Sequence, residues 1–209
     1  MFNELPLFHA AKQEIESLRP ALAQLGDIIV RHNLEEDIGI NLLHRHFDLE
    51  SGEILLKEVF EDHAMIAPRA AGTPATPYLF KVTSTGLVPT EYIAPNSMYH
   101  GEVSMRMAAL NKCPELFEAI TGLGLADKLG IFLRHQEFAE GSDMAWVEDS
   151  AEGRELVIRK QRLTADVQQS VTETNWFFKK RMHSSDPQAG VFCGVCCLVH
   201  CGIHCGWHS

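Results

Sequence analysis

Residues 39–60 read Gly-Ile-Asn-Leu-Leu-His-Arg-His-Phe-Asp-Leu-Glu-Ser-Gly-Glu-Ile-Leu-Leu-Lys-Glu-Val-Phe, and this stretch decides the expected fold. Its two halves have the composition and spacing of strands, and the polar residues 48–52 between them are typical of a turn. The stretch therefore predicts a β-hairpin. Because side chains two positions apart on a strand point to the same face, we expect His44 and His46 to project together.

Helical patterns occur on both sides of this hairpin. Apolar residues recur at threes and fours over residues 8–32, which predicts two helices or one kinked helix, divided by Pro20 and Gly26. A second helical pattern covers residues 102–125 and is expected to break before Pro114.

The remaining segments predict strands and turns. Residues 61–77 are rich in Ala and Pro and are expected to form a linker. Short polar turns between neighbouring strands favour an antiparallel sheet. The expected fold class is therefore α+β, with a single globular domain over residues 1–190 and a separate tail over residues 191–209. The predicted strands are residues 40–47, 53–60, 78–83, 88–93, 129–138, 143–148, 155–162 and 168–178.

The tail is rich in potential metal ligands. Cys193–Ser209 holds five of the six cysteines and three of the eleven histidines, in four-residue units that open with Cys and close with Cys or His. Thiolates and neutral imidazoles are the preferred ligands of zinc and of reduced copper. Two turns of helix would gather most of these side chains on one side, although the glycines predict a loosely ordered tail until metal binds. The candidate ligands are Cys193, Cys196, His204 and His208 for one ion, and Cys197, His200, Cys201 and Cys205 for a second.

Three other interpretations of the tail stay open: a disulfide framework, lipid attachment at the clustered cysteines, and a tail without function. The spacing does not match a zinc finger, in which about twelve residues separate the cysteines from the histidines. A DNA-reading finger is therefore disfavoured.

The hairpin itself carries a second candidate metal site. Two histidines and a carboxylate form a sound ligand set for a non-haem metal ion, and His44, His46 and Glu50, or another carboxylate, could supply it. The stretch Gly39 to Glu50 resembles the first metal motif of the cupin barrel, which has a glycine, a His-x-His pair and a glutamate. This resemblance implies that the two histidines and Glu50 ligate a metal. The alternative is two histidines that face a polar groove or solvent.

A wider resemblance covers Gly39 to Leu56 together with the Cys/His-rich end, and it is to uncharacterised proteins of filamentous fungi. It implies no activity and no catalytic residue. The chain shows no dinucleotide-binding fingerprint, phosphate-binding loop or nucleophile elbow. Three further side chains are expected to fill the core: Cys113, Trp146 and Trp176.

Composition limits the partners. The 209 residues are 45% hydrophobic and 22% charged, which is ordinary for a globular protein, and the net charge of −10 argues against a nucleic-acid partner. The first residues do not resemble a secretory signal, and no run of about twenty apolar residues predicts a membrane span. We expect a reducing, cytoplasmic location, in which the thiols stay free.

Two functions follow from these observations. The first is a protein that binds zinc, or alternatively reduced copper, through its tail, as a structural clamp, a store or a sensor. The second is a metal-dependent enzyme with its ion on the His-x-His pair and a carboxylate. A third possibility joins the two, with the tail folded back over His44 and His46.

Overall fold

The computed structural model describes residues 2–135, 144–150, 153–180 and 192–200, with the last range described for its backbone only. Its ten strands are β1 (Ile38–Leu42), β2 (Glu53–Val59), β3 (His63–Ala70), β4 (Thr76–Thr83), β5 (Gly86–Ile93), β6 (Leu129–Leu133), β7 (Met144–Ser150), β8 (Leu156–Arg162), β9 (Val171–Lys179) and β10 (Phe192–His200). The α-helices are α1 (Phe8–Ala11), α2 (Ile15–Arg31), α3 (His100–Arg106), α4 (Pro114–Gly122) and α5 (Ala165–Ser170), and 3-10 turns cover Phe2–Glu4, Lys12–Glu14 and Met107–Asn111.

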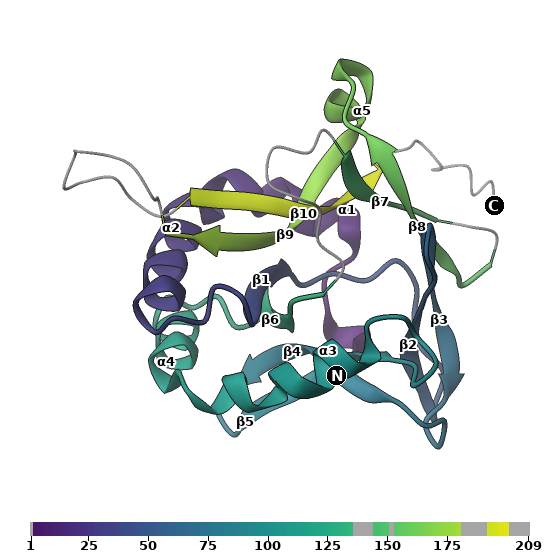
Figure 1. The fold of residues 1–209 in the computed structure, drawn as a ribbon, viewed down its shortest axis with the longest axis horizontal. Helices are drawn as coiled ribbons and strands as arrows, with labels where there is room; N and C mark the ends of the chain where they lie inside the picture. Colours follow the sequence, from purple (N-terminus) through teal and green to yellow (C-terminus); the bar gives the residue numbers. More distant parts are fainter. Residues whose placement is uncertain (1, 136–143, 151–152, 181–191, 201–209) are drawn as a thin grey trace.

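The strands form a closed barrel in the order β1-β6-β4-β5-β2-β3-β8-β7-β10-β9, and β9 pairs back onto β1 (Figure 1). Among the described strands only the β2·β5 and β7·β10 pairs are parallel. Together with the helices, this largely antiparallel sheet confirms the predicted α+β class. Closure leaves no free sheet edge, so the inward side chains of many strands meet in one interior.

The helices lie outside the barrel. Figure 1 shows α2 and α4 together on one side, and α2 also contacts β9 while α3 and α4 contact β4. The buried residues of α2 recur at threes and fours, as the sequence predicts. Pro20 and Gly26 do not divide this segment, because both lie inside α2. A Cβ atom at Gly26 would come within 2.3 Å of the Phe178 ring, so glycine allows α2 to approach β9 closely.

The hairpin prediction for residues 39–60 is wrong. β1 pairs with β6 and β9, whereas β2 pairs with β3 and β5. All five residues of β1 are buried, as expected of a strand covered on both faces. The predicted linker over residues 61–77 is also wrong, because it contains β3, which forms the hairpin with β2.

Several other predictions are confirmed. β4 and β5 form a hairpin, as do β7 and β8, and α4 begins at Pro114, where proline is favoured because its missing N–H would have no helical partner. Cys113 is a free, buried thiol, and Trp176 is fully buried in the core. The predicted strand over residues 129–138 is shorter in the structure, where β6 ends at Leu133, and residues 136–143 lie outside the described part of the chain.

The start of the tail forms strand β10, whereas the glycines predict a loosely ordered segment there. β10 runs antiparallel to β9 and parallel to β7, and it thereby closes the barrel. Residues 201–209 lie outside the described ranges. Of the helices in the part of the chain that is described, none is long and apolar enough to cross a membrane.

Candidate metal centre

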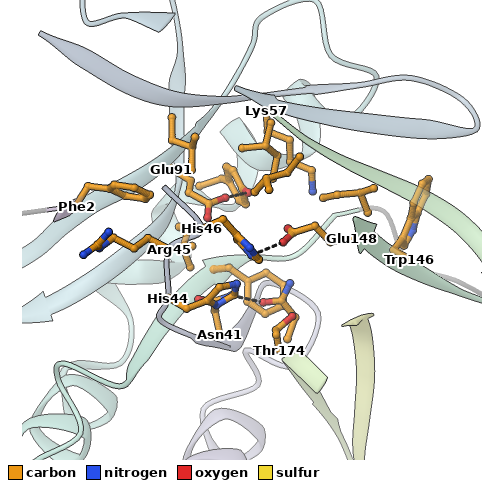
Figure 2. A pocket seen from close by; sticks show the side chains of 18 of the residues that line it. Phe2, Asn41, His44, Arg45, His46, Lys57, Glu91, Trp146, Glu148 and Thr174 are labelled. Atoms are coloured by element: carbon orange, nitrogen blue, oxygen red, sulfur yellow. Dashed lines mark hydrogen bonds and ion pairs between the residues drawn. The ribbon is translucent and has the colours of Figure 1, made fainter. Parts of the chain in front are cut away.

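A cavity inside the barrel collects polar side chains from strands on all sides (Figure 2). Its volume is about 60 Å³, measured as the space that the centres of water molecules can occupy. The cavity is therefore large enough for water or a small ligand. The polar side chains that line it are Asn41, His44, Arg45, His46, Lys57, Tyr78, Glu91, His135, Glu148, Thr174 and Asn175.

His44 and His46 enter this cavity from the segment that follows β1. The backbone of Arg45, between them, accepts a hydrogen bond from the Phe8 N–H at 3.0 Å and donates one to the Pro6 carbonyl at 2.9 Å. This bridge to the N-terminal segment keeps the backbone locally extended, so the two imidazoles lie on one side, with ring centroids 5.1 Å apart. The expected common orientation of the two histidines therefore holds, although they follow a strand instead of belonging to one.

Phe8 supports both rings. Its centroid lies 5.1 Å from that of His44 and 5.3 Å from that of His46, and it stacks on the second ring at 24°. The Nδ1–H of His44 donates to the Leu42 carbonyl at 2.7 Å. A neutral His44 consequently presents an unprotonated Nε2, which is the form that binds a metal ion.

The carboxylate beside these histidines is Glu148, from β7. Glu148 is buried, with only 7% of its surface exposed, and it lines the cavity. Trp146, two positions earlier on the same strand, also lines the cavity. Between them Val147 faces the other way and packs with Val167 of α5 and with Val171. This alternation along β7 turns Glu148 inward.

His44, His46 and Glu148 together have the geometry of a metal site. One potential ligand atom from each lies within 4.8 Å of the other two. Nε2 of His46 and Oε1 of Glu148 face each other at 2.9 Å, and both atoms are buried without a hydrogen bond to another described group. Buried polar atoms rarely stay unsatisfied, and a shared cation would satisfy both.

Burial and neighbouring charges shift the pKa values of His44 and Glu148 toward the protonation states that a metal needs. Burial, with the neighbouring His46, lowers the pKa of His44 to about 4, so His44 is neutral at neutral pH. Burial opposes ionisation of Glu148, but its contact with His46, together with His44 and Lys57, outweighs burial and holds the pKa of this carboxyl below its usual value. The site therefore offers a neutral imidazole at His44 and a carboxylate at Glu148.

The structure does not bring Glu50 to this site. The Glu50 side chain is 78% exposed and pairs with Arg154 at 3.4 Å. Glu50 belongs to a surface segment that continues into β2 after the chain has left the cavity, and Glu148 stands where that carboxylate was expected. For the tail, Cys193, Cys196, Cys197 and His200 are placed by their backbone only, and Cys201, His204, Cys205 and His208 lie outside the described residues.

Sequence reasoning missed the other polar pairs of the cavity. Lys57 Nζ lies 3.1 Å from His135 Nε2, and His135 donates its Nδ1–H to the Leu133 carbonyl at 2.8 Å. Burial and Lys57 hold the pKa of His135 well below its usual value, so His135 is a neutral acceptor. Two further pairs complete the polar lining: Tyr78 donates its hydroxyl to Glu91, and Asn41 donates to Asn175 at 2.5 Å.

The carboxyl of Glu91 should control how stability depends on pH. Burial raises its pKa to about 7, against the hydrogen bond from Tyr78. The fold therefore keeps a proton that the unfolded chain loses above its ordinary pKa of 4.5, so Glu91 lowers stability progressively from about pH 4.5 to 7. Across this pH range, the shifted pKa of Glu91 lowers the free energy of unfolding by about 3 kcal/mol. In metal-free protein, Glu91→Gln should stabilise the fold relative to wild type by an amount that grows over this range.

Denaturant unfolding of both proteins at pH 5, 6 and 7.5 measures this difference. Glu58→Gln, on β2, is the control for loss of a carboxyl outside the cavity. A constant difference between Glu91→Gln and wild type at all three pH values would contradict the prediction.

Comparisons of the chain with known protein families, with curated proteins and with solved structures give no match.

Proposed function

We propose that this protein is a metal-dependent enzyme whose divalent ion binds inside the barrel to His44, His46 and Glu148. The observation that carries the proposal is the pair of buried ligand atoms, Nε2 of His46 and Oε1 of Glu148, which face each other at 2.9 Å beside His44. Each of these two atoms has only the other as a close polar neighbour, and a shared cation would satisfy both.

Zinc is the ion we propose first. Two imidazoles and a carboxylate are a known ligand set of catalytic zinc, and they also suit ferrous iron. No sulfur atom belongs to the described site, so reduced copper, which prefers thiolates, is the weaker candidate here.

The cavity supports catalysis over storage. Three protein ligands leave at least one coordination position for water or substrate, and a bound ion would supply Lewis-acid activation there. Around this position the chain itself provides a proton-exchanging carboxyl at Glu91, hydrogen-bonded to Tyr78, and a buried amine at Lys57. A buried carboxyl beside the open coordination position is placed for general acid-base work.

Metal analysis tests the proposal. Purified protein, stripped with chelator and dialysed against zinc, should retain one ion per chain at the barrel, and His46→Ala should lose that ion. The expected result is a loss of one equivalent. Equal zinc content in wild type and His46→Ala would exclude the barrel site.

The Cys/His-rich tail is the second candidate, and the eight regularly spaced donors favour it. Binding there would make the protein a metal clamp, store or sensor. Truncation after His200 keeps β10 but removes Cys201, His204, Cys205 and His208. Under the barrel proposal the truncated chain keeps its one equivalent, whereas a tail site would lose metal on truncation and keep it in His46→Ala.

A further inference from the structure

We propose that the cavity takes a short carboxylate that bears an oxygen on its second carbon, as in small 2-oxo and 2-hydroxy acids. Its carboxylate and second oxygen would chelate the metal ion, and Lys57 would donate to the carboxylate. This inference rests on the proposed metal centre and names its substrate class.

The first support is coordination. His44, His46 and Glu148 supply three donors, and a two-histidine, one-carboxylate site characteristically leaves adjacent positions open. Two neighbouring oxygens on one small molecule can fill such positions together, and a carboxylate with an adjacent oxygen has that arrangement.

The second support is charge. A divalent ion with the single charge of Glu148 leaves a net positive centre, and Lys57 adds a cation 8% exposed on the same cavity wall. His135, its neighbour at 3.1 Å, is a neutral acceptor. Arg45, also in the lining, pairs with Asp48. The metal and Lys57 therefore favour an anionic ligand, since charge complementarity decides which ligands enter a buried site.

The third support is size and shape. The cavity, with about 60 Å³ of space for water centres, suits a small molecule. Figure 2 places His46 and Glu148 between Lys57 and Glu91 on one side and His44 and Asn41 on the other. Apolar side chains complete the lining and suit a short carbon chain: Leu55, Ile66, Leu79, Phe132, Leu156 and Ile158.

Three probes separate these requirements. Pyruvate carries both features, propionate lacks the second oxygen, and pyruvamide lacks the charge. Wild-type protein is first loaded with cobalt(II) without any carboxylate, and each probe is then titrated while the visible absorption of the ion is followed. Pyruvate should change the spectrum and bind at least about tenfold more tightly than either of the other probes.

Lys57→Met tests the cationic contact. It should weaken pyruvate binding at least about tenfold and leave cobalt affinity within about threefold of wild type. Lys81→Met is the matched control, since Lys81 pairs with Asp127 at 2.5 Å and does not line the cavity. Should Lys57→Met fail to fold, Lys57→Arg replaces it, because arginine keeps the positive charge and should retain pyruvate binding. The relative affinities of wild-type protein for pyruvate and pyruvamide then decide whether the negative charge of the ligand is recognised.

The outcomes separate the two proposals. Failure of wild type to bind cobalt at the barrel overturns the metal centre and this inference with it. A bound ion whose spectrum ignores pyruvate, equal affinity for pyruvate and pyruvamide, or equal pyruvate binding to metal-free protein overturns the substrate class and leaves the metal centre standing.

Discussion

Glu148→Gln is expected to weaken zinc binding by more than about 100-fold, because even residues that only orient metal ligands contribute 10–100-fold. The substitution keeps the size of the side chain and removes the negative charge that attracts the zinc ion. Competition with a chromogenic chelator at pH 7 measures the affinity. Far-ultraviolet circular dichroism should stay unchanged, since Glu148 belongs to a closed barrel whose backbone pairing does not involve its side chain.

Glu50→Gln is the matched control for this prediction. Both residues are glutamates, but the Glu50 side chain is 78% exposed and pairs with Arg154, whereas the Glu148 side chain is 9% exposed and faces two histidines. Zinc affinity in Glu50→Gln should equal that of wild type. A large loss in Glu50→Gln with none in Glu148→Gln would reverse the assignment of the carboxylate ligand.

Gly39→Ala is expected to lower the free energy of unfolding by about 2–3 kcal/mol, which is the range for overpacking a core. A Cβ atom at this position would lie 2.5 Å from the Phe132 ring and 2.7 Å from the Trp176 backbone carbonyl. The ring could shift, but the carbonyl belongs to β9, which pairs with β1 next to this position. The melting temperature should fall by roughly 5–10 °C.

Gly72→Ala separates this crowding from the general effect of replacing glycine. Gly72 lies in the turn after β3 with no atom within 4 Å of the added Cβ, and alanine there should be neutral or slightly stabilising because it restricts the unfolded chain. Equal melting temperatures for the two variants would contradict the close packing of β1 against β9.

The sequence predicted the helices and the fold class better than the strand partners. The spacing of apolar residues in α2 is a local property, so it survives folding unchanged. The partners of β1 and β2 were not predictable from alternation, because this pattern tells which face is buried but not which strand lies beside it. The ten residues between the two strands, 43–52, also exceed the two to five residues usual for hairpin loops.

The site was half predictable for a similar reason. His44 and His46 are two residues apart, so their common orientation follows from a short extended segment. Glu148 lies about a hundred residues further on, and only closure of the barrel brings it to them. The sequence does place Glu148 two positions after Trp146 on a predicted strand, so its carboxylate is expected on the same inward face as Trp146. This pattern does not predict that the carboxylate lies beside His44 and His46.

Crystallography of the zinc-loaded chain with anomalous diffraction at the zinc edge tests the central claim most directly. We expect one anomalous peak inside the barrel, about 2.0–2.2 Å from a nitrogen of His44, a nitrogen of His46 and an oxygen of Glu148. An anomalous peak only among cysteines of the tail, with the barrel interior empty, would contradict the proposed metal centre.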